Sequence, residues 1–190
     1  MEREEPFCRT VSLRKVHFLE PRPDEIDIRD IAFHLAKIGR FNGGIRLGHY
    51  SVAEHSILMS LELDDIKDKK YALLHDAAEY IFGDLQAPIK RMCPDYNMLI
   101  DTFQRYIFAK FGLNHLMPSY IDTLDKRICS SEMVQLRGQD FVPGIKEPPL
   151  NNPVAFQLFT PEQAEESFLF HFAQYWGNDA EQYLLGDAAP

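Results

Sequence analysis

The chain has 190 residues, of which 45% are hydrophobic and 26% are charged, a composition typical of a globular domain with a substantial core. No segment approaches the ~18 apolar residues that a helix needs to cross a bilayer, and the start, MEREEPFCRT, lacks the apolar core of a signal peptide. The net charge of −9 argues against DNA or RNA as a partner, because binding to these polymers depends on Lys and Arg that neutralise phosphates. A small phosphorylated ligand remains compatible with this charge, since a single pocket can be cationic.

The cysteine content indicates a reducing compartment. Cys8, Cys93 and Cys129 are few, far apart and odd in number, which argues against a disulfide framework. We therefore expect a cytoplasmic protein, in the host cytoplasm if a phage encodes it, with no membrane partner.

The first part of the chain predicts one extended segment and then a helix. Residues 9–21 alternate in hydropathy and are expected to be extended. Residues 27–40 predict a helix that ends near Gly39, because the apolar positions recur at the spacing of one helical face: Ile28, Ile31, Ala32, Leu35 and Ile38. Residues 41–50 contain three glycines and predict a loop.

A capping signal opens the second predicted helix. Ser51 is followed three residues later by Glu54, the pattern of a capping box. This start places His55 in the first helical turn, close to the preceding loop. A third helix is predicted over about residues 68–82, ending at Gly83.

The next two helices are predicted over residues 96–111 and about 119–136. Asp95 is the expected N-cap of the first, and Gly112 follows its end. Residues 139–156 are rich in Pro and Asn and predict a loop.

The last predicted helix covers residues 160–176. Thr160 is its expected N-cap, and Pro161 lies at the first helical position. Since nearly every long segment predicts a helix, the expected fold class is all-α, with layers of helices packed in one domain over residues 1–190.

Four polar residues interrupt the apolar faces of the second and third predicted helices: His55, His75, Asp76 and Glu79. A charged carboxylate buried there without a partner would cost several kcal/mol. These groups either satisfy one another in the core or hold an ion. Two imidazoles and a carboxylate suit Mn, Fe, Co, Ni or Zn, and an acidic residue from another helix would complete the site. The other histidines are expected to have structural roles: His17, His34, His49, His115 and His171.

Three sequence strings carry a family resemblance: DIAFHLAKIGRFNG, YSVAEHS and LLHDAAEYIFGDLQAPIK. Together they resemble the HD-domain metal-dependent phosphohydrolases, in particular the branch that contains bacterial 5'-deoxynucleotidases, phage dATP triphosphohydrolases and the oxetanocin-pathway HD phosphohydrolase. The resemblance covers about residues 20–137 and implies an HD-domain helical bundle. About residues 157–186 are expected to form a helical extension outside it.

The resemblance implies a set of metal ligands. His55, His75 and Asp76 match the first three ligands of the family. The fourth is an Asp about fifty residues later that is followed by a Glu seven residues on; Asp125 fits this pattern because Glu132 follows it. Asp122, one turn earlier, lacks an acidic residue at that offset.

Further positions match the active site of the nucleotidase branch. Arg40 lies at the spacing of an arginine that contacts the nucleotide, although it could instead cap the preceding helix at its C-terminus. Glu79 and Asp84 match two acidic residues with catalytic roles, and Asp84 could alternatively belong to a plain turn. Lys90 resembles a lysine that reaches a phosphate. Phe41 could stack on a base or anchor its loop.

The resemblance implies hydrolysis of 2'-deoxynucleoside 5'-phosphates with a divalent transition metal and, alongside the substrate phosphates, a second ion such as Mg. The preferred substrate is a dNTP, with dATP a candidate, which would yield deoxynucleoside and triphosphate. The alternatives are a 5'-deoxynucleotidase that acts on dNMP, a non-catalytic nucleotide-binding HD protein, and HD chemistry on cyclic nucleotides or alarmones. Relatives of this branch form dimers or larger rings, so a homo-oligomer such as a dimer or hexamer is expected.

Overall fold

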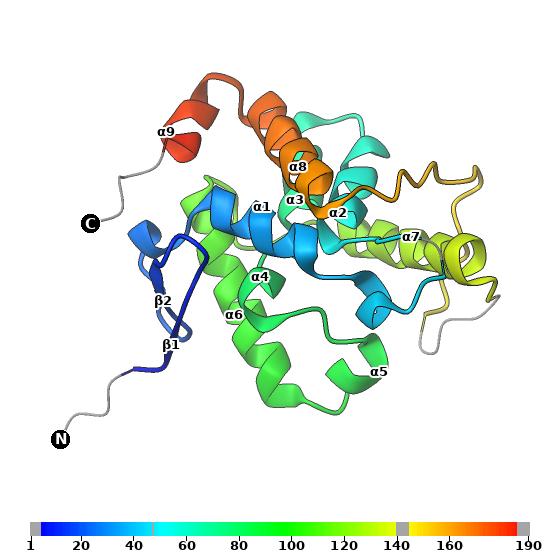
Figure 1. Ribbon diagram of the computed structural model, residues 1–190, viewed down its shortest axis with the longest axis horizontal. Helices are drawn as coiled ribbons and strands as arrows, with labels where there is room; N and C mark the ends of the chain where they lie inside the picture. Colours follow the sequence, from blue (N-terminus) through cyan, green and yellow to red (C-terminus); the bar gives the residue numbers. More distant parts are fainter. Residues whose placement is uncertain (1–4, 47, 140–144, 186–190) are drawn as a thin grey trace.

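Helices carry nearly all of the regular structure in the computed structural model, which describes residues 5–46, 48–139 and 145–185 (Figure 1). The prediction of an all-α fold is confirmed for this part of the chain. In chain order the elements are β1 (Phe7–Arg9), β2 (Lys15–His17), η1 (Pro23–Glu25), α1 (Ile28–Lys37), η2 (Arg40–Gly43), α2 (Val52–Leu61), α3 (Ile66–Leu74), α4 (Glu79–Phe82), α5 (Ala87–Lys90), α6 (Pro94–Lys110), α7 (Ser119–Arg137), α8 (Pro161–Trp176), η3 (Gly177–Ala180) and α9 (Glu181–Leu184).

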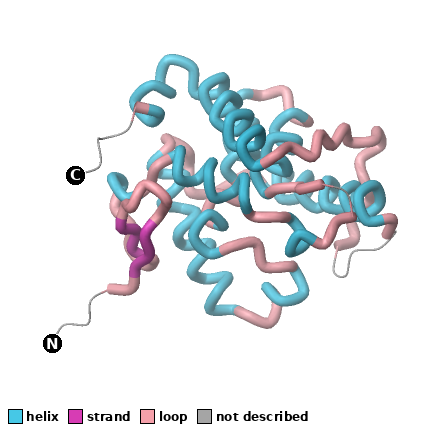
Figure 2. The backbone as a smooth tube through the Cα atoms, viewed as in Figure 1, coloured by secondary structure: helices cyan, strands magenta, loops and turns pink. Residues whose placement is uncertain are grey.

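The extended segment predicted at 9–21 is a small antiparallel hairpin (Figure 2). β1 pairs with β2 in the register Phe7 to His17, so only part of the predicted range is strand. The turn between the strands is tied to α1, because the hydroxyls of Thr10 and Ser12 both donate to the Asp30 carboxylate.

α2 is the central helix of the bundle. It packs against α1, α3, α7 and α8, and α1 in turn lies beside α8 (Figure 1). Most of its side chains are buried, including the polar side chains of Glu54, His55, Ser56 and Ser60. A helix buried on all sides has no solvent face for polar residues, so these groups need partners inside the protein.

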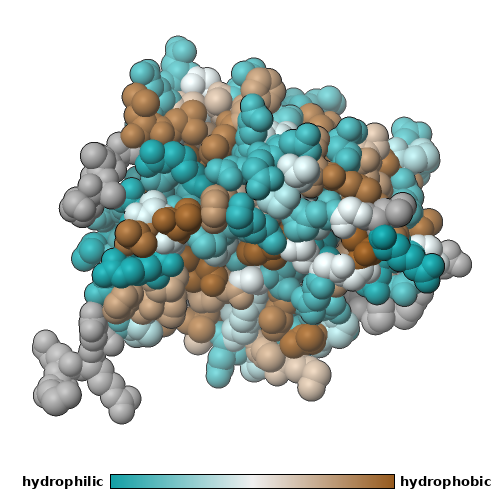
Figure 3. All heavy atoms as spheres, in the orientation of Figure 1, coloured by the Kyte–Doolittle hydropathy of each residue, from teal (hydrophilic) through white to brown (hydrophobic). Residues whose placement is uncertain are grey.

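The surface carries mostly polar side chains with scattered apolar ones (Figure 3). No helix among the described residues is long and apolar enough to span a membrane.

The start of α2 agrees only in part with the predicted capping box. The Ser51 hydroxyl accepts from Glu54 N–H at 3.1 Å, as expected. The Glu54 carboxylate does not return to Ser51; it accepts the backbone N–H groups of residues 157–159 at 2.8–3.0 Å. The reciprocal half of the prediction is therefore wrong, because a distant segment offers this carboxylate three donors.

The helix predicted over 68–82 is two helices. α3 begins at Ile66, after Asp65 has capped it, and ends at Leu74; α4 begins at Glu79. Turns occupy residues 75–78. The physical reason is a side chain from α6, Gln104, which hydrogen-bonds the backbone at this point.

The predicted N-cap of α6 is wrong by two residues. Cys93 occupies the N-cap position, and Pro94 is the first helical residue, so Asp95 lies in the first turn. Proline favours this position because it lacks the N–H that would have no helical acceptor there.

The remaining predicted segments agree with the structure where it describes them. α7 matches the helix predicted over 119–136, and Thr160 caps α8 by accepting from Gln163 N–H. The predicted loop 139–156 has no helix or strand over 145–156. Residues 140–144 and the predicted end of the C-terminal extension at 186 lie outside the described residues.

Replacing Phe172 by Ala should destabilise the fold by about 3–5 kcal/mol, because its ring is fully buried and stacks on Trp176 at a centroid distance of 4.2 Å. Chemical denaturation followed by circular dichroism measures the change. Phe170→Ala is the matched control on the same helix, since Phe170 is 58% exposed; its effect should stay within about 0.5 kcal/mol. Equal losses for the two variants would contradict the assigned core.

Candidate metal centre

Side chains from three parts of the chain converge at the C-terminal end of α3. His55 comes from α2, His75 and Asp76 from the turns that follow α3, and Asp125 from α7. The Nε2 atoms of His55 and His75 are 3.3 Å apart. Asp76 Oδ2 lies 3.1 Å from His75 Nε2, and Asp125 Oδ1 lies 3.1 Å from His55 Nε2. The structure therefore brings all four predicted ligands together.

The hydrogen bonds of the two imidazoles direct their free nitrogens toward this point. His55 Nδ1 is 2.5 Å from Glu132 Oε1, and His75 Nδ1 is 2.8 Å from Ala72 O. A carboxylate and a carbonyl can only accept, so Nδ1 is the donor in each ring. In the neutral imidazole Nε2 then carries the lone pair. Two lone pairs and two carboxylates thus face one another, a donor set that needs a cation.

The spacing of these atoms fits one ion. Ligands that bind a transition metal at about 2.1 Å are separated from their neighbours by roughly 3.0–3.4 Å. The His–His and the His–Asp pairs of the site span 3.1–3.9 Å. The His55 and His75 side chains are 0% and 4% exposed, whereas Asp76 and Asp125 are 20% and 31% exposed. The centre is therefore closed on the histidine side and open on the carboxylate side, as expected for a site that admits a substrate.

The ionisation of the site shows how strongly it favours positive charge. Burial lowers the pKa of His55 and Arg40 lowers it further, but Glu132 and Asp125 outweigh both, so that the net pKa is raised. Burial also opposes charge on His75, yet Asp76 and Asp125 raise its pKa well above the ordinary value. The surrounding carboxylates thus favour positive charge at both imidazoles.

Glu132 is the main residue of the site to which the sequence assigned no role. It is fully buried, and its carboxylate accepts from Tyr50 Oη at 2.6 Å and from Arg40 Nη2 at 2.9 Å, in addition to contacting His55. Burial opposes this charge, but Arg40 and His55 lower the pKa of Glu132 to about 2. A carboxylate on the outer nitrogen of a ligand histidine fixes the orientation of its ring. The sequence signal for Glu132 was its position seven residues after Asp125, about two helical turns later.

A backbone hydrogen bond between the two ends of the 40–50 loop positions Arg40. Arg40 N–H donates to Tyr50 O at 2.9 Å, which returns the loop to the start of α2. The Arg40 guanidinium forms an ion pair with the Glu132 carboxylate, and its Nη1 lies 3.6 Å from Asp76 Oδ2. Arg40 therefore points into the site, and the alternative that it caps α1 is wrong.

Phe41 follows Arg40 in a left-handed conformation. Phe41 and Asn42 have φ values of 56° and 54°, and residues other than glycine pay about 1 kcal/mol or more for this geometry. The Phe41 ring lies between two guanidinium groups, with centroid distances of 5.6 Å to Arg40 Cζ and 5.3 Å to Arg137 Cζ. Strain of this kind is typical of functional loops.

A cavity of about 280 Å³ adjoins the carboxylate side of the centre. Its polar lining includes Arg40, Asp76, Asp84, Lys90, Asp125 and Arg137, and its apolar lining includes Phe41, Leu85, Pro88, Met133 and Ile145. The lining thus combines charged side chains with an aromatic ring and aliphatic side chains. Such an arrangement suits a ligand with an anionic and an apolar part.

Glu79 and Lys90 form a pair at the edge of this cavity. Lys90 Nζ donates to Glu79 Oε1 at 2.7 Å and lies 3.9 Å from Asp84 Oδ1. Burial raises the pKa of Glu79 well above its ordinary value, and Asp76 and Asp84 raise it further. Glu79 lies behind Lys90 and is not among the residues that line the cavity.

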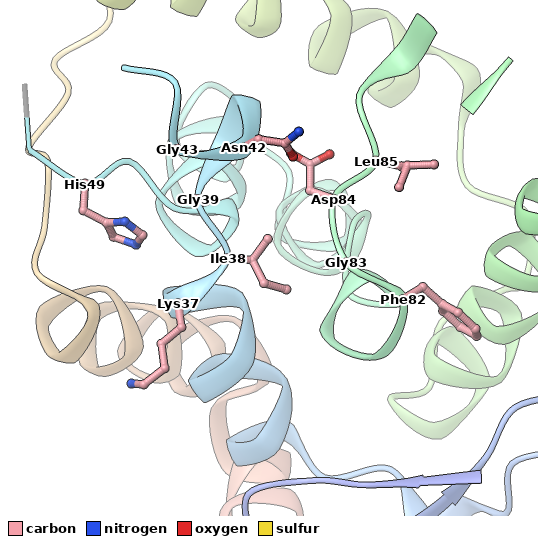
Figure 4. Close-up of a pocket in the computed structure, with 10 residues that line it drawn as sticks. All are labelled: Lys37, Ile38, Gly39, Asn42, Gly43, His49, Phe82, Gly83, Asp84 and Leu85. Carbon is pink, nitrogen blue, oxygen red and sulfur yellow. The ribbon is translucent and has the colours of Figure 1, made fainter. Parts of the chain in front are cut away.

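A second cavity, of about 500 Å³, lies on the other side of Asp84 between the 39–49 loop and the end of α4 (Figure 4). Asp84 and Leu85 line both cavities. In Figure 4 the side chains of Asn42 and Asp84 point toward one another. Asp84 is therefore more than a turn residue, because its side chain lines both cavities.

Most of the other histidines have structural partners. His17 pairs with Glu25, and His34 accepts from Val11 N–H. His49 and His171 lie at hydrogen-bond distance from backbone carbonyls of α1 and α8. The prediction of structural roles is confirmed for these four.

Comparison with known proteins gives two relatives, and no family model matches the chain. An uncharacterized protein of Rhodobacter capsulatus is 32% identical over 180 residues, which cover 84% of this chain and 90% of that protein. YfdR, an uncharacterized protein of Escherichia coli K12, is 35% identical over 127 residues, which cover 66% of this chain and 70% of YfdR. At this identity and coverage the three chains form one family.

Asp125→Asn should weaken the binding of Co²⁺ or Mn²⁺ at least 10-fold, because a neutral amide replaces a predicted ligand. Asp122→Asn is the matched control on α7: Asp122 is 54% exposed and pairs with Lys126. Calorimetric titration of protein stripped with EDTA measures both affinities. Comparable losses in the two variants, or a loss in Asp122→Asn alone, would contradict the assignment of Asp125.

Metal affinity should rise with pH between about pH 6 and pH 8. The raised pKa values of His55 and His75 mean that the metal-free rings bind protons more tightly than an ordinary histidine, and an incoming ion must displace these protons. Protons compete less with the metal ion as the pH rises through the pKa values of these two rings. Titrations in buffers of different ionisation enthalpy should therefore report proton release. An affinity independent of pH, with the same heat in every buffer, would refute this picture.

Proposed function

We propose that this chain, which belongs to the same family as the Rhodobacter capsulatus protein and YfdR, is a metal-dependent phosphohydrolase that acts on 2'-deoxynucleoside 5'-phosphates. The observation that carries the proposal is the convergence of His55, His75, Asp76 and Asp125 at the edge of a cavity whose lining also includes cationic side chains, among them Arg40 and Lys90. The resemblance to HD-domain nucleotidases supports the same conclusion from the sequence.

His55, His75, Asp76 and Asp125 would hold the metal. A divalent ion bound there supplies Lewis acidity and lowers the pKa of a water molecule at neutral pH. The protein's share of the chemistry lies in the groups around this point, which bind, orient and neutralise the substrate.

Arg40 and Lys90 are suited to the phosphate. Arg40 offers a planar set of donors that matches phosphate oxygens, and Lys90 offers a compact charge. Both are partly compensated by carboxylates, Glu132 and Glu79 respectively. These pairs fix the cations in place before the substrate arrives, so that little side-chain entropy is lost on binding.

Glu79 is suited to handling a proton. Its raised pKa lies in the direction that general acid–base catalysis near neutral pH requires. Its second carboxylate oxygen, Oε2, is buried without a hydrogen-bond partner among the described residues. Because Glu79 contacts Lys90, which lines the cavity, a proton held by Glu79 would reach the site through Lys90 rather than directly, and Asp84 is the catalytic acidic candidate that lines the cavity itself.

Phe41 is suited to the nucleoside end. Its strained backbone presents the ring to the cavity beside Met133 and Ile145. Base stacking on an aromatic ring contributes about 1–3 kcal/mol and tolerates different bases. The nucleoside would then lie along α7, with its phosphate at Asp125.

Incubation with dATP or dAMP in the presence of Co²⁺ or Mn²⁺ should release deoxyadenosine, with triphosphate as the second product from dATP. Ion-exchange chromatography or phosphorus NMR identifies the phosphate product. Release of orthophosphate from dAMP with dATP untouched would instead favour a 5'-deoxynucleotidase.

Asp76→Ala serves as the inactive control for contaminating phosphatases. A protein that binds deoxynucleotide and metal but releases no product would support the non-catalytic alternative.

A further inference from the structure

The backbone leaves regular α-helical geometry at the two residues that supply adjacent predicted ligands. Between Leu74, the end of α3, and Glu79, the start of α4, hydrogen bonds run to the third residue back: Ala77 N–H donates to Leu74 O, and Glu79 N–H donates to Asp76 O, both at 3.0 Å. These are the tighter bonds of a 3₁₀ turn. His75 and Asp76 lie inside this tightened stretch.

Gln104, on α6, takes the place of the missing α-helical hydrogen bond. In a continuous helix Ala78 N–H would donate to Leu74 O. Gln104 Oε1 accepts from Ala78 N–H at 2.8 Å, and Gln104 Nε2 donates to Leu74 O at 2.7 Å. One side-chain amide is thus inserted between two backbone groups that would otherwise bond each other, a known cause of helix breaks.

The inserted group has to donate and accept at the same time. The primary amide of Gln104 does both, whereas a carboxylate or an aliphatic side chain in its place could not. The neighbouring residue, Phe103, anchors α6: it is fully buried, and its ring contacts Tyr80 and Phe82 at centroid distances of 6.0 and 5.4 Å. The amide is therefore carried by a helix that is itself fixed against α4.

We infer that Gln104 is a positioning residue for the metal centre, which holds the backbone of residues 74–78 so that His75 and Asp76 reach the same point. Neighbouring residues of a regular helix point about 100° apart, yet Asp76 Oδ2 lies 3.1 Å from His75 Nε2. The inference rests on the metal centre of the proposed function and is independent of the substrate and the reaction.

Gln104→Leu removes both hydrogen bonds, and Gln104→Glu keeps the acceptor but not the donor. Gln163→Leu is the control, because Gln163 accepts one backbone N–H at the start of α8, outside the site. Each full-length protein is stripped of metal, titrated calorimetrically with Co²⁺, and compared by the visible absorption of bound Co²⁺ and by metal-free thermal unfolding.

Gln104→Leu should weaken Co²⁺ binding by roughly 10- to 100-fold and change the Co²⁺ spectrum. Gln104→Glu should show a smaller loss, and Gln163→Leu should bind as the unaltered protein does. If Gln104→Leu does not fold, Gln104→Glu decides the question by the same measurements.

Unchanged Co²⁺ affinity and spectrum in the folded Gln104 variants, whatever their melting temperature, would overturn the inference. Normal Co²⁺ binding by the unaltered protein without hydrolysis of any deoxynucleotide would contradict the proposed function and leave the inference standing. Failure of the unaltered protein to bind any divalent ion would overturn both.

Discussion

The buried carboxylate of Glu132 is the constraint on which the rest of the site depends. It binds a guanidinium, a phenol and an imidazole at once, from Arg40, Tyr50 and His55. Arg40 and Tyr50 come from the start and the end of the loop before α2, and His55 comes from α2 itself. One side chain of α7 therefore holds three successive parts of the chain. Removing one partner of a buried charge costs several kcal/mol, which gives the arrangement its rigidity.

This network explains how a central, buried helix accommodates the polar side chain of His55. His55 is satisfied at Nδ1 by Glu132, and its Nε2 faces the other predicted ligands. Arg40 then balances part of the negative charge that Glu132 and Asp76 bring into the core. The polar groups form a chain from the interior to the cavity, where Asp76, Asp125 and Arg40 line the open space.

Sequence patterns located the helices well because helices depend on local spacing, and the family resemblance picked out four candidate ligands that the fold brings together. Ser51 and Thr160 were identifiable as caps, and the offset from Asp125 to Glu132 distinguished Asp125 from Asp122. Long-range partners could not be found this way. The break at residues 75–78 depends on Gln104, some thirty residues later, and the partners of Glu54 lie a hundred residues later. Neither relation leaves a periodic signal in one sequence.

The partners of Glu54 connect the C-terminal part of the chain to the site. Three consecutive backbone N–H groups, from residues 157–159, converge on this carboxylate, and Leu158 adopts a φ of 53° in doing so. Such a concave set of donors is a typical anion-binding arrangement of the backbone. Just before it, Phe156 packs edge-on against Tyr50, the phenol that donates to Glu132. The first turn of α2 is thus fixed from one side by Glu132 and from the other by the segment before α8. The C-terminal region outside the family resemblance therefore contributes to the site without supplying a ligand, because it holds the helix that carries His55.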